Sequence, residues 1–312
     1  MRTAVGVDLG GTKIAAGIVD LEGRILDRAE LPSSIDDPNA VRDQIAELVR
    51  KLSPDSHTLG LGIGAAGIVN FATGHYLYGP NTGLREVELA RIVEEEVDLP
   101  VRLDNDANCA AWAEHRFGIG KGTRHFVCIT LGTGIGGGFV LDGRPYRGAH
   151  GGAAEIGHMI VDPDGPVCGC GRRGCWEQFA SGLALEASAL AGLNDRPNSS
   201  LKDALVAGRI PGRAITDAAR AGDALAVEVV ERMGRWIGWG LGSLVNIIEP
   251  ERIAVAGGIV REWDLLGPLA LEAMRDRIEA SERRPEPDVL PATLGPDAGI
   301  VGAAWLILGG LD

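Results

Sequence analysis

An internal repeat of a glycine-rich hairpin limits the possible folds of this chain more than any other feature. Residues 5–20 (VGVDLGGTKIAAGIVD) align without a gap with residues 127–142 (VCITLGTGIGGGFVLD). Each copy is typical of a strand of β-branched residues, a glycine turn and a second strand, with Asp8 opposite Thr130. A chance resemblance between two glycine-rich hairpins is the alternative. We interpret the repeat as two related lobes that each offer a glycine turn to one central cleft.

The rest of the chain alternates strands with helices, which predicts an α/β fold with mixed sheets and ligands at the ends of strands. Its 312 residues suggest two domains. We expect a smaller N-terminal lobe at 1–115 that includes the C-terminal helix 299–312. We expect a larger lobe at 116–298 that carries a cysteine-rich segment, 155–178.

The charge argues against a nucleic-acid partner. The formal net charge is −13, whereas proteins that bind a phosphate backbone gather Lys and Arg on one surface. An anionic ligand would have to be held locally by backbone amides, by a lysine or by a metal ion. The longest apolar run, 236–248, is too short to span a membrane and predicts a buried helix. The first residues predict a strand and a turn rather than a signal peptide, so we expect a cytoplasmic protein.

The second glycine turn, 132–137, formally matches the G-x-G-x-x-G pattern of dinucleotide-binding proteins. That pattern must open a helix, but here the chain continues as a strand into an Asp-Gly turn. A P-loop is excluded too, because GIGKGT lacks its spacing. Tight-turn chemistry explains one such loop as well as a phosphate does. Two matched turns, with Gly257 and Gly258 at another strand end, favour a phosphate held by backbone N–H groups.

Acidic residues stand beside these turns. Asp8 ends a strand, where it could hold Mg²⁺ through water while Lys13 faces a phosphate. A turn-capping Asp and a solvated Lys are the alternative. Asp106 lies at the start of a predicted helix, and taken alone this position favours an N-cap. Beside a phosphate-binding turn, the same carboxylate is suited to accept a proton from an attacking hydroxyl, with Asn105 to orient that hydroxyl.

Three of the five cysteines crowd into eight residues. With His158, the spacing His-x9-Cys-x-Cys-x4-Cys supplies the four ligands of a tetrahedral zinc site, namely His158, Cys168, Cys170 and Cys175. Because the ligand set is complete, the site would be structural rather than catalytic. Reduced surface thiols or a labile disulfide are the alternatives. Cys109 and Cys128 are most simply buried apolar residues.

Taken together, these motifs resemble those of the ROK sugar kinases. The resemblance runs from Val5 to the final helix through VDLGGTKIAAGIVD, GIGAAGIVN, LDNDANCAAWAE, TLGTGIGGGFV, EIGHMIVDPDGPVCGCGRRGCWEQ and VAGGIV. It implies an actin-like fold of two ribonuclease-H-type lobes, which would explain the repeat. It also implies MgATP as phosphoryl donor and a hexose, glucose foremost, phosphorylated at O6.

The resemblance assigns roles to single residues. Asp106 would be the general base, and one ring nitrogen of His158 would face the sugar while the other binds structural Zn²⁺. The sugar hydroxyls would be bound by Asn81, Asn105, Asp106, Glu155, His158 and Glu177. The nucleotide and its Mg²⁺ would be held by Asp8, Gly10, Gly11, Thr12, Lys13, Gly132, Thr133, Gly134, Gly136, Gly137, Gly257 and Gly258.

Other readings stay open within the same family. A kinase for N-acetylmannosamine, N-acetylglucosamine, fructose or allose carries similar motifs, and some ROK relatives are sugar-sensing transcriptional repressors. The resemblance also implies a homodimer or homotetramer, with no membrane partner. Whether polyphosphate can replace ATP does not follow from the motifs.

Overall fold

The computed structural model describes residues 1–79 and 82–309, which fold into two compact units. The first unit comprises Met1–Ile129, Gly137–Ala154 and the chain from Ala292 onward. The second comprises Thr130–Gly136 and Glu155–Pro291. The expected division into lobes at residue 115 stays a prediction.

A five-stranded mixed sheet forms the centre of the first unit, with the order β3-β2-β1-β4-β8. The antiparallel part joins β1 to β2 and β2 to β3, whereas β4 runs parallel to β1 and to β8. A small antiparallel sheet of β5, β6 and β7 belongs to the same unit. The strands are β1 (Thr3–Leu9), β2 (Lys13–Asp20), β3 (Ile25–Pro32), β4 (Thr58–Ala65), β5 (Ile68–Asn70), β6 (His75–Tyr78), β7 (Arg85–Val87) and β8 (Val101–Asn105).

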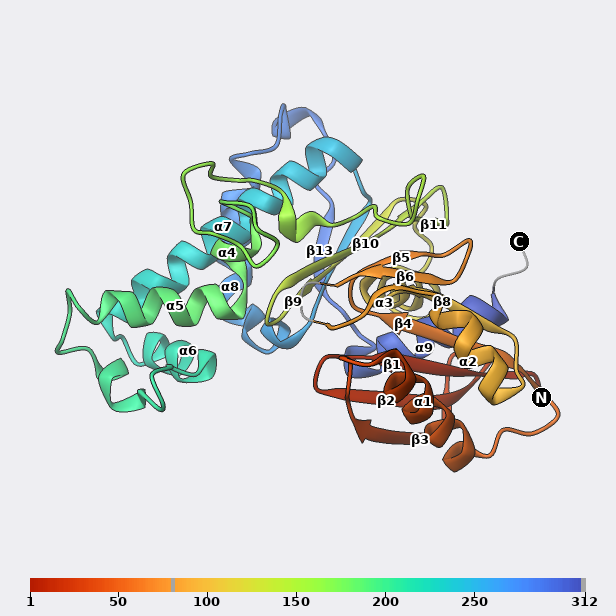
Figure 1. Ribbon diagram of the computed structural model, residues 1–312. Coiled ribbons are helices and arrows are strands. Elements are labelled where there is room, and N and C mark those ends of the chain that lie inside the picture. The colour runs from red at the N-terminus through yellow and green to blue at the C-terminus, as the bar shows by residue number, and fades with distance from the viewer. Residues whose placement is uncertain (80–81, 310–312) are drawn as a thin grey trace. The chain divides into compact units, whose positions relative to one another are not determined.

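Helices cover both faces of this sheet (Figure 1). The helices α1 (Pro38–Leu52) and α2 (Leu89–Val97) bury the larger apolar cluster of the unit against one face. Helix α1 starts where the Asp37 carboxylate accepts the N–H of Asn39 at 3.0 Å, with Pro38 at its first position. The opposite face is covered by α3 (Asp106–Arg116) and α9 (Ala298–Leu308). The short 3₁₀ helix η5 (Gly295–Asp297) leads into α9.

Glycines allow α9 to lie directly on the sheet. A methyl group at Gly6 of β1 or at Gly62 of β4 would overlap the backbone carbonyls of Ile300 or Ala303 in α9. Gly302 of α9 has the same relation to the backbone of α3. Glycines of this chain therefore serve helix-on-sheet packing as well as tight turns.

The second five-stranded sheet has the order β11-β10-β9-β12-β13, which repeats the connection order of the first. Its strands are β9 (Phe126–Leu131), β10 (Ile135–Leu141), β11 (Arg144–Tyr146), β12 (Arg252–Ala256) and β13 (Asp288–Pro291). As expected, β10 runs into a two-residue turn, with φ 52° at Asp142 and 75° at Gly143, and returns as β11. The dinucleotide pattern therefore does not open a helix, and the repeat of two strand–turn–strand units is confirmed.

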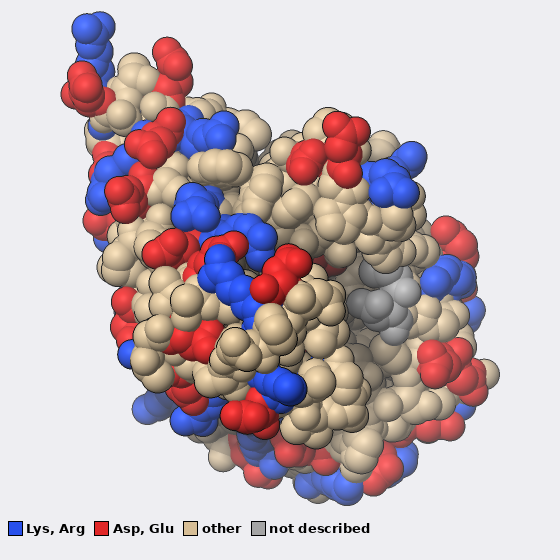
Figure 2. All heavy atoms as spheres, turned by 90° about the vertical axis from the view of Figure 1, so that its left-hand side faces the viewer, with Lys and Arg blue, Asp and Glu red and all other residues tan. Residues whose placement is uncertain are grey.

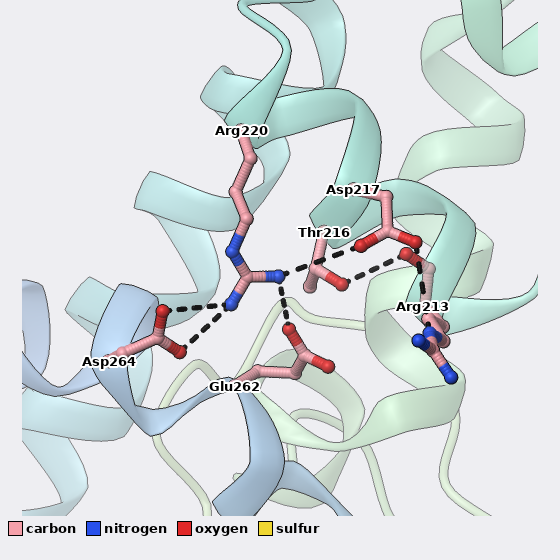
Figure 3. Close-up of polar contacts among 6 residues, drawn as sticks. All are labelled: Arg213, Thr216, Asp217, Arg220, Glu262 and Asp264. Carbon is pink, nitrogen blue, oxygen red and sulfur yellow. Dashed lines mark hydrogen bonds and ion pairs between the residues drawn. The ribbon is translucent and has the colours of Figure 1, made fainter.

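Helices make up most of the second unit. They are α4 (Glu177–Ala180), α5 (Gly182–Gly192), α6 (Gly212–Arg220), α7 (Ala224–Ile248) and α8 (Trp263–Arg275), with the 3₁₀ helices η1 (Ile156–His158), η2 (Ser200–Ala204), η3 (Gly258–Glu262) and η4 (Ser281–Arg283). The apolar run predicted as a buried helix is the second half of α7. Ion pairs tie α6 to the start of α8 (Figure 3): Arg220 reaches Glu262 at 2.7 Å and Asp264 at 2.8 Å.

On the face drawn in Figure 2, Lys and Arg are interspersed with Asp and Glu rather than gathered in one basic patch. No helix within residues 1–79 and 82–309 has the length and apolar character needed to cross a bilayer.

Candidate active site and metal centre

The acidic residues predicted near a phosphate lie at the ends of neighbouring parallel strands in the first unit. In the registers of β1, β4 and β8, Asp8 pairs with Gly64, and Gly64 pairs with Asp104. Asn105 and Asp106 follow directly, where β8 ends and α3 begins. Because the carboxyl ends of parallel strands meet at one edge, this is the place where an α/β sheet binds ligands.

The N-cap of α3 is not Asp106, the residue that its sequence position alone favours. Asn105, not Asp106, is the N-cap: its Oδ1 accepts the N–H of Asn108 at 3.0 Å. Its Nδ2 donates to the carbonyl of Gly67 at 3.0 Å, which fixes the other end of the amide. Asp106 is therefore the first helical residue, and its carboxylate accepts the adjacent Ala107 N–H at 2.9 Å. Capping by Asp106, the alternative interpretation of this position, is therefore wrong, and the Asp106 carboxylate does not cap α3.

Burial makes both carboxylates unusual acids. The pKa of Asp106 is raised by burial, opposed by the Ala107 N–H and reinforced by the charge of Asp104. The pKa of Asp8 is raised to about 6 by burial first and by the charge of Asp106 second, against the lowering effect of Lys13 and Arg28. Because the charge of Asp106 raises the pKa of Asp8, a divalent cation beside these carboxylates would be favourable.

The N-terminus of α9 faces Asp8. A methyl group on Gly299, in the first turn of that helix, would lie 2.9 Å from Oδ2 of Asp8. Glycine is therefore the residue that lets the carboxylate approach the positive end of the helix dipole. Sequence reasoning had placed Asp8 correctly at a strand end and had predicted a C-terminal helix, but it gave no sign that this helix faces Asp8.

An ion pair between Arg147 and Asp104, which sequence reasoning missed, lies at the same edge of the sheet. Arg147 donates from Nε to Oδ2 of Asp104 at 2.6 Å, and its guanidinium lies 3.9 Å from the centre of the Phe71 ring. The side chain of Asp104 is only 3% exposed, so the pair is largely desolvated. Asp104 also accepts the Asn105 N–H at 2.8 Å and the Asn108 amide at 3.1 Å. These contacts hold the start of α3 in place.

The first glycine turn is a tight hairpin. The N–H of Gly10 donates to the carbonyl of Lys13 at 3.1 Å, and Gly11 and Thr12 are exposed at its tip. The ammonium of Lys13 lies 3.3 Å from Glu30 on the surface. A weak exposed pair of this kind leaves the lysine available to a phosphate.

The second glycine turn is partly occupied by the protein itself. The N–H groups of Gly132, Ile135 and Gly136 donate to the Gly134 carbonyl at 3.0 Å, to Glu177 Oε2 at 2.9 Å and to Thr130 Oγ1 at 3.1 Å. These three groups are therefore not available to a phosphate in this conformation.

At the end of β12, Gly257 and Gly258 have different surroundings. Gly257 has φ 87°, and a side chain there would overlap the carbonyl of Leu131. Around Gly258, no atom of the described chain comes within 4 Å of an added methyl group. The backbone of Gly258 is thus open to a ligand, as expected for a nucleotide contact.

The four residues predicted as zinc ligands come together in the second unit. One ligand atom from each of His158, Cys168, Cys170 and Cys175 lies within 4.8 Å of all the others. Nδ1 of His158 is 3.7 Å from Sγ of Cys168, and Sγ of Cys170 is 3.6 Å from Sγ of Cys175. Zinc–sulfur bonds of about 2.3 Å in a tetrahedron would place the sulfurs about 3.8 Å apart. The donor set and its spacing fit Zn²⁺, and all five cysteines are free thiols.

Trp176 anchors this cluster to the long helix α7. Its side chain is fully buried, and Nε1 donates to the carbonyl of Trp236 at 2.7 Å. A methyl group on Gly240 would overlap the indole ring, so the helix presents a glycine where the ring lies. Trp176 stands between Cys175 and Glu177, and it therefore fixes a metal ligand on one side and a predicted sugar ligand on the other.

Glu177 joins the metal cluster to the second glycine turn. Its Oε2 binds the Ile135 N–H, and its Oε1 lies 4.0 Å from Sγ of Cys168. Glu155 is exposed just before η1, where its carbonyl accepts the N–H of His158 at 3.1 Å. Asn81, the remaining predicted sugar ligand, lies outside the described residues.

The comparisons with known proteins agree over the whole chain. The family model described as "ROK family" matches residues 4–309. The glucokinase of Streptomyces coelicolor is 43% identical, and the match covers 98% of both chains. The glucokinase of Halalkalibacterium halodurans is 36% identical over 98% of this chain and 95% of the relative. The N-acetylmannosamine kinase of Escherichia coli O7:K1 is 35% identical over 98% of this chain and 99% of the relative.

Solved structures of the same kind are similar in fold. The ROK family glucokinase of Streptomyces griseus, crystallised with glucose and AMPPNP, has a TM-score of 0.87 at 43% identity, covering 99% of this chain and 100% of that chain. The ROK hexokinase of Thermus thermophilus has a TM-score of 0.83 at 34% identity, with 99% of both chains covered. These likenesses confirm the predicted actin-like, two-lobed α/β fold.

Proposed function

The chain belongs to the ROK family, and we propose that within it the protein is a glucokinase that transfers the γ-phosphate of ATP to the 6-hydroxyl of glucose. One observation carries this proposal: the chain matches, over nearly its full length and at 43% identity, a solved glucokinase that holds glucose and an ATP analogue. The half-buried Asp106 at a sheet edge supplies the chemical group that such a transfer needs.

In the proposed reaction, Asp106 accepts the proton of the sugar O6 as the O6–P bond forms and the bond between the γ-phosphorus and the β–γ bridging oxygen breaks. ADP leaves with that bridging oxygen. Phosphoryl transfer has a loose transition state, so the main task of Asp106 is to position the hydroxyl and take its proton late. A carboxylate whose pKa is raised by burial is a stronger base for this step. Asn105, fixed at both ends of its amide, orients the same hydroxyl.

The phosphates of ATP would be held by the glycine turns and Lys13. Asp8 would hold Mg²⁺ through water, and the ion supplies positive charge to the β- and γ-phosphates. The raised pKa of Asp8 supports this role, because the buried carboxylate lacks a full countercharge of its own. Gly258, with open space beside its backbone, is assigned to the nucleoside.

The sugar hydroxyls would be bound by Glu155, His158 and Glu177. If Nδ1 of His158 binds Zn²⁺, its Nε2 is left for a sugar hydroxyl. The role of the zinc is structural: it joins His158 to Cys168, Cys170 and Cys175 in one rigid segment. Glu177 is tied to the same segment through Trp176 and Ile135. Because this segment would be rigid before the sugar binds, less conformational entropy would be lost on binding.

N-acetylmannosamine kinase is the second candidate, since relatives with that name are up to 35% identical over the full chain. The higher identity of the glucokinases favours glucose. The proposed use of ATP and glucose fits the cytoplasmic location expected from the sequence. Assembly as a homodimer or homotetramer remains a prediction from the resemblance.

A coupled assay of ADP release across a sugar panel tests the proposal. The panel contains glucose, fructose, allose, N-acetylmannosamine and N-acetylglucosamine, each with ATP and with polyphosphate as donor. We expect the highest kcat/KM for glucose with ATP, and product analysis should place the phosphate on O6. A higher kcat/KM for an N-acetylated sugar would overturn the choice of glucose, and no turnover with any sugar would overturn kinase activity.

A further inference from the structure

A buried tyrosine hydroxyl lies next to the residues assigned to the sugar. Tyr76, in β6, is 1% exposed. Its Oη lies 2.7 Å from the carbonyl oxygen of Ala66 and 3.1 Å from Oγ1 of Thr82. A carbonyl can only accept, so Tyr76 donates to Ala66 and the Thr82 hydroxyl donates to Tyr76. Three segments of the first unit therefore meet at one oxygen atom.

Two glycines make room for this hydroxyl. Gly67 has φ 126°, and a methyl group added there would lie 2.6 Å from Oη of Tyr76. A methyl group on Gly79 would overlap the same oxygen. The backbone at Gly67 and Gly79 thus lies too close to the Tyr76 hydroxyl for any side chain larger than hydrogen. A space shaped for one hydroxyl indicates that its hydrogen bonds, rather than only the ring, hold the local structure.

The turn that Tyr76 binds is also the turn that binds Asn105. The carbonyl of Ala66 accepts from Tyr76, and the next carbonyl, that of Gly67, accepts from Nδ2 of Asn105 at 3.0 Å. Oδ1 of Asn105 in turn caps α3, whose first residue is Asp106. A shift of the Ala66–Gly67 turn would therefore rotate the Asn105 amide and move the start of the helix.

We propose that Tyr76 is a positioning residue for sugar binding, and that the hydrogen-bond chain from Thr82 through Tyr76 to Ala66 sets the orientation of Asn105. The inference rests on the proposed function, in which Asn105 and Asp106 contact the sugar. Tyr76 itself does not contact the sugar in this proposal; it acts on Asn105 through the Ala66–Gly67 turn.

The chemistry of the group supports this role. Burial raises the pKa of Tyr76, so the hydroxyl stays protonated and remains a donor across the working pH range. Phenylalanine at this position keeps the ring but removes both hydrogen bonds. The Ala66 carbonyl would then lose its tyrosine donor, and the Thr82 hydroxyl would keep only its longer contact, 3.5 Å, to the Gly79 carbonyl.

The test measures KM for glucose and KM for ATP separately. We expect Tyr76→Phe to raise KM for glucose about five- to tenfold, the effect of one or two lost hydrogen bonds. KM for ATP should stay within about twofold, because the hydrogen-bond chain from Tyr76 ends at Asn105 and the start of α3 and includes none of the residues assigned to the nucleotide. Thr82→Val should change KM for glucose in the same direction, Thr82→Ser should restore it, and the Tyr76→Phe/Thr82→Val pair should be less than additive.

Tyr78→Phe is the matched control. Tyr78 is in the same strand, is 38% exposed and makes no hydrogen bond through its hydroxyl within the described residues. Its variant should have the KM values of the original protein. If Tyr76→Phe unfolds, Thr82→Val, at a half-buried site, carries the test alone.

Two outcomes would overturn the inference. KM for glucose within twofold of the original in both single variants would show that the chain does not position Asn105. Equal increases in KM for glucose and for ATP would indicate general loosening of the unit. The unsubstituted protein is assayed first: absence of its own hexose phosphorylation refutes the proposed function and this role with it, whereas normal turnover with unaffected variants refutes the role of Tyr76 alone.

Discussion

Asp8 and Asp106 are electrostatically coupled within one unit. After burial, the charge of Asp106 is the largest influence that raises the pKa of Asp8 to about 6. The two residues stand 98 positions apart in the sequence, and the parallel registers of β1, β4 and β8 bring their strand ends together. The repulsion between the two ionised carboxylates is therefore unfavourable, and a cation would relieve it.

Asp8→Asn should stabilise the metal-free protein at pH 8 while it lowers activity. The folded pKa of about 6 lies above the ordinary value of 3.8, so the native state holds a proton between these values and stability falls as pH rises through this window. The substitution removes that cost above pH 6 and changes little at pH 4. Melting curves in chelator at both pH values check this; an equal loss of Tm at both would contradict it.

Asp106→Asn should lower kcat about a thousandfold and leave glucose binding nearly unchanged. An amide keeps the size of the side chain but cannot accept the O6 proton, and general-base catalysis contributes about a hundred- to ten-thousandfold. Calorimetric titration with glucose and single-turnover assays separate binding from chemistry. Asp43→Asn, at an exposed position on α1, is the control. Turnover within tenfold of the original would rule out Asp106 as the base.

Cys170→Ser should release zinc. With one of four ligands lost, the segment from His158 to Cys175 has little apolar packing of its own to hold it, so Tm should fall and KM for the sugar should rise. Metal analysis by mass spectrometry should find about one zinc per chain in the original protein and in Cys128→Ala, which alters a buried cysteine outside the cluster. An unchanged metal content and Tm in Cys170→Ser would exclude the structural site.

Gly62→Ala should destabilise the first unit by about 3 kcal/mol, the upper part of the usual range for overpacking. The new methyl group would overlap the carbonyl of Ala303, and both partners are backbone that cannot rotate away. Gly132→Ala is the control, since no described atom lies within 4 Å of its added methyl group. Chemical denaturation measures both variants. Similar unfolding free energies for the two would show that α9 does not rest on Gly62.

Asp223→Ala should cost about 1–2 kcal/mol at pH 7 and almost nothing near pH 2. The carboxylate caps α7 through the N–H groups of Leu225 and Ala226 at 3.0 Å and binds the hydroxyls of Ser199 and Ser200. These hydrogen bonds outweigh burial and lower its pKa to about 2. The stabilisation is therefore present above the ordinary pKa of 3.8 and is lost as pH falls toward 2. A pH-independent difference in unfolding free energy would refute this account.

Much of the fold could be predicted because its signals are local. The repeat of strand, glycine turn and strand follows from residue order, and a C-terminal helix was expected where α9 lies. The cluster of His158 with Cys168, Cys170 and Cys175 could be predicted because a metal site imposes its own spacing on the sequence. In each of these cases, residues close together in the sequence are enough to predict the feature.

Features that depend on distant partners could not be predicted. Arg147 pairs with Asp104 across 43 residues, and nothing around Arg147 distinguishes it from a solvated arginine. Asn105 and Asp106 are both good capping residues, and the carbonyl of Gly67, 38 residues away, decides between them by holding the Asn105 amide. Nothing in the local sequence shows that Gly6 and Gly62 lie under a helix, or that Gly302 contacts the backbone of α3.

The position of α9 bears on how the chain folds during synthesis. The strands that this helix covers leave the ribosome well before residues 298–308 are made. At about 5–20 residues per second, an uncovered β1–β4 face would wait roughly 15–60 s for this layer. During that interval the face is exposed to wrong partners, and a ribosome that stalls before residue 298 leaves the first unit without its covering helix.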